Sequence, residues 1–150
     1  MGLLPDTSNS ELGQALPTYT DTSNTYKMQV DADRIKGNVR TNLEAVQQAI
    51  YKALNTERRT FAIYSWNYGV ELKDLFGKPV PYCMAEIPRR IEEALLVDDR
   101  IESVEDFELS HNGAGEILCK FKAVTIYGDL VLEKKVGVAE CMRMRQTKIS

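Results

Sequence analysis

The spacing of apolar residues changes period near Ile101, and this change limits the folds available to the chain. In the two longest patterns before that point, apolar residues recur every three or four positions, as on one face of a helix. After it they alternate with polar residues, as in strands with one buried face. Helices followed by a run of strands are typical of an α+β fold. We therefore predict two main helices packed on a small antiparallel sheet, with a C-terminal three-stranded meander.

The first long helix is predicted to run from Thr41 to about Asn55. Thr41 is followed three residues later by Glu44, which is the pattern of a capping box. In that motif the hydroxyl and the carboxylate each accept a hydrogen bond from a free backbone N–H. The apolar stripe of this helix comprises Leu43, Val46, Ile50 and Leu54.

A second helix is predicted before Ile101, although two prolines lie within its pattern. Its apolar stripe comprises Met84, Ile87, Ile91, Ala94 and Leu95, and its polar face comprises Arg89, Arg90, Glu92 and Glu93. Proline inside a helix removes a hydrogen bond and clashes with the preceding turn. Either Pro81 starts a helix that kinks at Pro88, or the regular helix begins near Ile87. We favour the kink.

Strands are expected at both ends of the domain. Tyr26, Met28 and Val30 alternate with polar residues, and residues 35–39 could pair back on them across a turn. The C-terminal meander is predicted to use residues 104–109, 116–126 and 130–136. A Gly-rich loop at 111–115 and a tight turn at 127–129 would join these three strands.

The stretch between the two helices contains the only tryptophan, Trp66. Residues 61–65 are rich in strand-forming side chains, so we predict a short strand there with both faces covered. Residues 67–69 are expected to form a turn. Leu72, Leu75 and Phe76 then suggest one helical turn, which Gly77 and Pro79 end.

A chain of 150 residues with 43% hydrophobic and 27% charged residues can bury the core of one domain. We assign residues 26–136 to this domain. Residues 1–25 are polar and rich in turn-forming residues, so they are expected to be a flexible N-terminal arm. Residues 137–150 are expected to be a C-terminal tail.

Charge and cysteine content exclude several classes of function. A net charge of −3 argues against a nucleic-acid binder, which normally has a basic face. Cys83, Cys119 and Cys141 lack the spacing of a zinc site or a disulfide framework, so we interpret them as reduced thiols of a cytosolic product. No apolar run approaches the ~18 residues of a membrane span, and no signal peptide is recognised. We expect no cofactor, no metal, no nucleic acid and no membrane partner.

Candidates for catalysis are weak. His111, the only histidine, is expected in the Gly-rich loop, exposed to solvent. The acidic residues that a glycosidase would need are Glu102, Glu105, Asp106 and Glu108, but strand alternation already explains their polarity. Gly113 and Gly115 lack the Lys-Ser/Thr that follows a phosphate-binding loop. We therefore predict that the protein is not an enzyme.

An interface is the stronger expectation. Trp66 and Tyr68 lie near Arg58 and Arg59, which is the composition of a protein–protein anchor. Alternatively, Trp66 belongs to the core. Glu57 and Arg58 could likewise serve only to neutralise the helix terminus and hydrogen-bond a loop.

Four segments together resemble a known family: LNTER at 54–58, IYSWNYGVEL at 63–72, RRIEEALL at 89–96 and TIYGD at 125–129. They are similar to XkdS-type proteins of prophage tails, which belong with the small baseplate wedge proteins of contractile tails, or sheath initiators. The likeness covers about residues 26–136.

This resemblance implies a structural role in the baseplate of a phage or a phage-derived bacteriocin, assembled in the bacterial cytoplasm. It implies six copies per particle, arranged around the tail tube, that contact other wedge proteins and the first ring of sheath subunits. Glu57 and Arg58 match a family motif that contacts the wedge bundle. The sheet is expected to receive sheath strands.

An edge strand with unpaired backbone groups supports that expectation. We therefore predict a partner interface of Glu57, Arg58, Arg59, Trp66, Tyr68, Leu130, Leu132 and Lys134. A cytosolic partner-binding regulator and a cell-wall hydrolase remain the alternatives.

Overall fold

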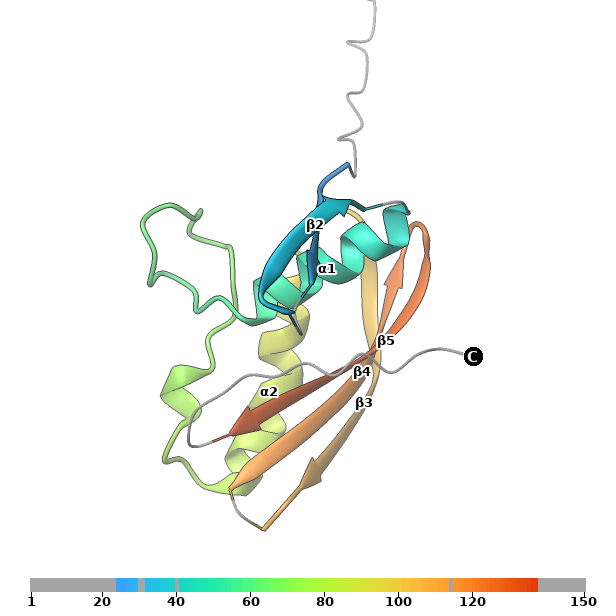
Figure 1. Cartoon of the computed structure of the whole chain (residues 1–150). Coiled ribbons are helices and arrows are strands. Elements are labelled where there is room, and N and C mark those ends of the chain that lie inside the picture. The colour runs from blue at the N-terminus through green and yellow to red at the C-terminus, as the bar shows by residue number, and fades with distance from the viewer. Residues whose placement is uncertain (1–23, 30–31, 40, 114, 138–150) are drawn as a thin grey trace, which may run out of the picture.

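A computed structural model describes residues 24–29, 32–39, 41–113 and 115–137 of the chain (Figure 1). Two α-helices, a two-stranded sheet and a three-stranded sheet confirm the predicted α+β fold. Most of the predicted N-terminal arm and C-terminal tail lies outside the described residues. Within the described part, no helix is both long enough and apolar enough to cross a membrane.

The predicted C-terminal meander is confirmed. Strands β3 (Ile101–His111), β4 (Glu116–Thr125) and β5 (Gly128–Gly137) form an antiparallel sheet in the order β3-β4-β5. The first connection is shorter than predicted, because His111 is still paired with Ile117. The second turn is Ile126 and Tyr127, because Gly128 already pairs with Thr125.

Helix α1 (Asn42–Leu54) begins as the sequence predicts. The Thr41 hydroxyl accepts a hydrogen bond from the Glu44 N–H over 3.2 Å. The Glu44 carboxylate contacts the Lys27 ammonium. The predicted stripe is buried at Val46, Ile50 and Leu54, and Leu43 packs against the core.

Helix α2 (Val80–Leu95) is one helix that contains both prolines. Pro81 lies in its first turn, where a missing N–H is tolerated, and Pro88 lies in its interior. The alternative start near Ile87 is therefore wrong. Arg90 also departs from prediction, because its side chain is only 11% exposed and donates to the Glu71 carbonyl over 2.7 Å.

A small sheet of β1 (Tyr26–Gln29) and β2 (Arg34–Asn38) confirms the predicted N-terminal pairing. The Gln48 side chain of α1 binds the other edge of β1. Its amide oxygen accepts from the Met28 N–H over 2.8 Å, and its amide nitrogen donates to the Tyr26 carbonyl over 2.9 Å. Gln48 thus makes the two bonds that an added strand would make.

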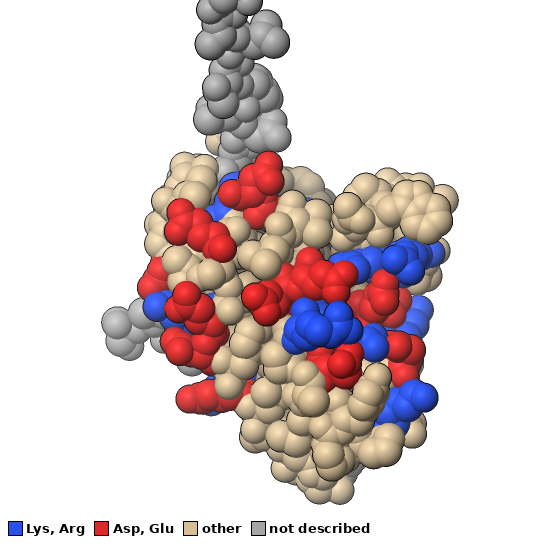
Figure 2. All heavy atoms as spheres, turned by 180° about the vertical axis from the view of Figure 1, so that it is seen from behind, with Lys and Arg blue, Asp and Glu red and all other residues tan. Residues whose placement is uncertain are grey.

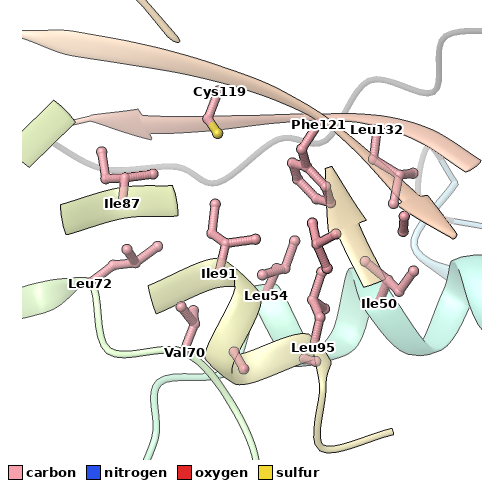
Figure 3. Close-up of a cluster of buried hydrophobic side chains, with 14 of the residues drawn as sticks. Ile50, Leu54, Val70, Leu72, Ile87, Ile91, Leu95, Cys119, Phe121 and Leu132 are labelled. Carbon is pink, nitrogen blue, oxygen red and sulfur yellow. The ribbon is translucent and has the colours of Figure 1, made fainter. Parts of the chain in front are cut away.

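The core lies between the helices and one face of the three-stranded sheet (Figure 3). Ile50 and Leu54 of α1, with Ile87, Ile91 and Leu95 of α2, face Cys119, Phe121 and Leu132 of the sheet. Val70 and Leu72, both fully buried, add the chain between the helices to this core. Full burial of such a side chain stabilises the fold by about 1.5–3 kcal/mol relative to exposure.

The predicted strand at residues 61–65 is wrong. This segment is a series of turns, and Phe61 and Ile63 are 54% and 83% exposed. Strand-forming side chains make a strand only where another strand supplies a ladder, and none of the described strands pairs with this segment. The predicted helical turn is confirmed as a 3-10 helix, η3 (Lys73–Leu75).

Candidate partner-binding surfaces

A loop of residues 59–68, called the aromatic loop below, projects from the body of the domain between α1 and η3 (Figure 1). The core alternative for Trp66 is wrong, because its side chain is 79% exposed. The Arg59 guanidinium carbon lies 6.0 Å from the centre of the Trp66 ring, at the limit of a cation–π contact. The aromatic loop therefore presents a large apolar ring beside a cation.

Stacked tyrosines connect this loop to the core. The rings of Tyr64 and Tyr68 are 4.6 Å apart and nearly parallel, and Phe61 meets Tyr64 edge-on at 6.3 Å. Tyr68 is partly buried against the core, and this burial raises the pKa of its hydroxyl. The inner end of the aromatic loop is thus anchored while Trp66 at its outer part is exposed.

The two ends of the loop are joined at its base. The Arg58 N–H donates to the Val70 carbonyl over 3.1 Å, and the Val70 N–H donates to the Thr56 carbonyl over 3.0 Å. Gly69 has a φ of +98°, and a Cβ there would lie 2.5 Å from the Thr56 carbonyl oxygen. This close approach requires glycine.

Glu57 and Arg58 strengthen the same base. The Glu57 carboxylate accepts hydrogen bonds from the N–H groups of Leu72 and Lys73, at 3.4 and 3.2 Å. Arg58, only 9% exposed, donates to the Gly69 carbonyl over 3.1 Å and to Glu93 over 2.8 Å. Both residues therefore hydrogen-bond a loop, which was the alternative to a partner contact in the interpretation of the sequence. Their contact with a partner stays a prediction.

Below the aromatic loop, acidic and basic side chains gather on the face seen in Figure 2. Their contacts form a continuous band along α2 and the chain before it, made by Arg58, Glu71, Asp74, Glu86, Arg89, Arg90 and Glu93. Hydrogen bonding to Arg90 lowers the pKa of Asp74, and hydrogen bonding to Arg58 lowers that of Glu93. These carboxylates are therefore ionised at neutral pH.

On β5 the structure places Leu130, Leu132 and Lys134 in the core, with exposures of 5%, 6% and 0%. Their main-chain N–H and C=O groups point toward β4. The Ile126 N–H donates to the Arg100 carbonyl, so even-numbered residues of β4 bond toward β3 and odd-numbered ones toward β5. Because Phe121 pairs with Leu132, the even-numbered residues of β5 make the internal ladder.

The main-chain groups of the neighbouring residues on β5 point toward the open edge of the sheet. Asp129, Val131, Glu133 and Lys135 direct their N–H and C=O groups away from β4, and no described strand is hydrogen-bonded to β5 on that side. A strand added at this edge would therefore bond these four residues and not Leu130, Leu132 and Lys134, and contact of either set with a partner stays a prediction.

The two edges of the sheet differ in regularity. Strand β3 has register shifts between Ile101 and Ser103 and between Glu105 and Glu108, with Asp106 at a φ of +54°. Such bulges twist an edge and interrupt its pairing. Strand β5 pairs one to one with β4 over ten consecutive residues, without a shift. Of these two edges, only that of β5 is regular enough to pair with an added strand along its whole length.

The carboxylates considered for catalysis, Glu102, Glu105, Asp106 and Glu108, are all exposed along β3, and His111 is exposed at its end. A tyrosine-rich hollow lies between β1, the end of α1 and the aromatic loop. It is lined by Tyr26, Met28, Tyr51, Lys52, Asn55, Thr56, Tyr64 and Tyr68, and thus by no carboxylate. Among the described residues, no group of three or more His, Cys, Asp or Glu side chains could hold a metal ion.

Sequence reasoning missed the role of Gln48, because nothing in a helical pattern marks an amide that reaches a strand edge. The alternation of Leu130, Leu132 and Val136 could have shown that the odd-numbered side chains of β5 lie on the face away from the core. Which main-chain groups point to the open edge follows only from the register with β4. Cys83 and Cys119 are buried free thiols, and burial raises the pKa of Cys119 to about 12. Cys141 lies outside the described residues.

Comparison with known proteins identifies the family. A sequence model of the contractile injection system sheath initiator matches residues 20–128. The Bacillus subtilis (strain 168) phage-like element PBSX protein XkdS is 39% identical over 140 residues, which cover 91% of this chain and 98% of that protein.

A crystal structure of a Geobacter sulfurreducens protein described as a tail lysozyme aligns with a TM-score of 0.58 and 18% identity, over 68% of this chain and 96% of that one. At that identity the likeness shows the fold alone. The sequence matches span most of the chain and confirm the resemblance: the chain belongs to the contractile injection system sheath initiator family and is a structural component of a phage-type tail.

Proposed function

We propose that this domain is a baseplate subunit that docks on wedge proteins through the aromatic loop and starts the sheath by receiving a strand at β5. The observation that carries this proposal is the regular outer edge of β5, ten residues long and without a bulge. A strand added there would complete the hydrogen bonds of Asp129, Val131, Glu133 and Lys135. Family membership supports this use of the edge.

The edges of the other strands are less suited than that of β5 to receive an added strand. Two bulges interrupt β3, and the Gln48 side chain already binds the outer edge of β1. Strand β2 has five residues, all exposed, and offers half the length of β5. Main-chain affinity in strand addition grows with the number of ladder bonds, so the longest regular edge is the best template.

The docking surface is proposed to be the aromatic loop with Arg59 and Trp66 at its centre. Exposed aromatic rings beside arginine are the residues that most often dominate the energy of an interface. The band of ion pairs next to the loop holds its base through Arg58. Glu57 and Arg58 therefore act in docking chiefly by holding the loop in position, and Tyr68 by anchoring it.

In the assembled particle, six copies of the domain would surround the tail tube and contact other wedge proteins and the first sheath ring. The particle would be a phage tail or a bacteriocin, assembled in the bacterial cytoplasm. The XkdS relative, named as part of a phage-like element, supports this setting.

Proline at Val131 tests strand addition directly. Val131→Pro removes one outward N–H and leaves the β4–β5 ladder intact, because that residue makes no internal ladder bond. In cells that make the particle, we expect tails with little or no sheath from Val131→Pro and normal sheaths from Val131→Thr, which keeps the N–H. Full-length sheaths in a folded Val131→Pro variant, seen by electron microscopy, would show that the β5 edge is not the template.

A further inference from the structure

Charged side chains on the outer face of the sheet follow a pattern across the strands. Glu108 on β3 pairs with Lys120 on β4, and Lys120 pairs with Glu133 on β5. In the next row, Glu105 pairs with Lys122, which pairs with Val131 and reaches diagonally to the carboxylate of Asp129 over 2.8 Å. Acidic and basic residues therefore oppose one another directly between β3 and β4, and in the first row also between β4 and β5, as is favourable.

This alternation stops at β5. Among the described residues, neither Glu133 nor Lys135 forms an ion pair, although Asp129 does. Glu133 and Lys135 are residues whose main-chain groups point to the outer edge of β5. The side chain of Val131, which is 45% exposed, lies on the same outer face of the sheet as theirs. A strand added beside β5 would place its own side chains opposite these three positions, about 5 Å away.

We infer that the strand received by β5 carries a basic residue opposite Glu133, an acidic residue opposite Lys135 and an apolar residue opposite Val131. This inference rests on the proposed strand addition at the same edge. Every strand pair in the sheet is antiparallel, so the incoming strand continues that arrangement. Read from its N-terminus, the partner segment is then acidic–x–basic–x–apolar, where x packs on the core side.

The pattern explains how one edge selects its partner. Main-chain bonds are the same for any extended segment, so they supply affinity and leave the register open. A slip by two residues would place the basic residue of the partner opposite Lys135 or Val131. It would also move the acidic residue of the partner away from Lys135. Like charges directly opposite one another are unfavourable, so the charge order fixes the register.

A tethered peptide tests this. The full chain is extended after Ser150 by a flexible Gly/Ser linker and a nine-residue segment of the acidic–x–basic–x–apolar order, because a linker of this kind gives millimolar effective concentrations. The matched control exchanges the acidic and basic positions and keeps the composition. Amide hydrogen exchange of Val131, Glu133 and Lys135 reports pairing, since these N–H groups face outward.

The expected result is exchange at those three amides slowed about tenfold more by the matched segment than by the exchanged one. In the double variant Glu133→Lys, Lys135→Glu, the preference should reverse. Equal protection by both segments would overturn the charge pattern and leave strand addition standing. No protection by either segment, in a folded protein, would overturn strand addition at β5 and the inference with it.

Discussion

The Lys134 ammonium on the edge strand β5 donates a 2.7 Å hydrogen bond to the carbonyl oxygen of Leu54, the last residue of α1. It donates a second, of 3.0 Å, to the side-chain oxygen of Asn55. A cation is favourable at the C-terminus of a helix, where carbonyl groups lack intrahelical partners. This contact joins the proposed strand template to the helix that leads into the aromatic loop.

Stability should depend on pH through this lysine. Burial lowers the pKa of Lys134 from 10.5 to about 8, so between those values the unfolded chain binds more protons than the folded one. The free energy of unfolding is therefore expected to rise as pH increases from about 8 to 10.5, by at most about 3 kcal/mol. Urea unfolding at several pH values measures this rise.

Lys134→Met is the control for that titration, because it keeps the length and apolar stem of the side chain and removes the charge. Other groups that titrate in this range are common to both proteins, so the difference between the two curves isolates Lys134. We expect the difference to change with pH above about pH 8. Parallel curves would show that the ammonium is not desolvated as the structure implies.

Arg58→Ala should destabilise the domain by about 1–3 kcal/mol. The change leaves the Gly69 carbonyl and the Glu93 carboxylate without this donor, and the Arg58 side chain is only 9% exposed. Arg59→Ala is the matched control, since that neighbouring side chain is 60% exposed and should cost less than about 0.5 kcal/mol. Equal losses in urea unfolding would contradict the assignment of Arg58 to the loop base.

Gly69→Ala should be among the most damaging changes at the base of the aromatic loop. It combines a φ of +98° with a Cβ 2.5 Å from the Thr56 carbonyl oxygen, and we expect a loss of about 2 kcal/mol or more. Gly37→Ala separates the two causes, because Gly37 has a φ of +63° and nothing within 4 Å of the added Cβ. A thermal melt that shifts equally in both variants would mean that the close approach adds nothing.

Trp66→Ala should separate stability from assembly. The ring is 79% exposed, so its removal should change the free energy of unfolding by less than about 0.5 kcal/mol. Incorporation into tail particles, measured by immunoblotting of purified tails, should fall at least tenfold if Trp66 anchors the wedge contact. Tyr82→Ala, at a 47% exposed position on α2 outside the loop, is the control. Normal incorporation of the Trp66→Ala variant would show that the aromatic loop is not part of the interface.

Local sequence determined the elements whose patterns are complete within one segment. The stripe from Val46 to Leu54, the Thr41 cap and the alternation on either side of Gly128 each contain their own signal, because helical and strand periods are properties of neighbouring residues. The family, too, was recognisable from segments such as the one around Trp66.

Tertiary structure decided what depends on partners distant in sequence. Residues 61–65 have strand-forming side chains but no strand beside them, so they form an exposed loop whose base is closed by Thr56 and Val70. The buried ammonium of Lys134 finds its acceptors 80 and 79 residues away, at the end of α1. Which edge can receive a strand follows from register, because β3 bulges and β5 does not, and register exists only once the strands have paired.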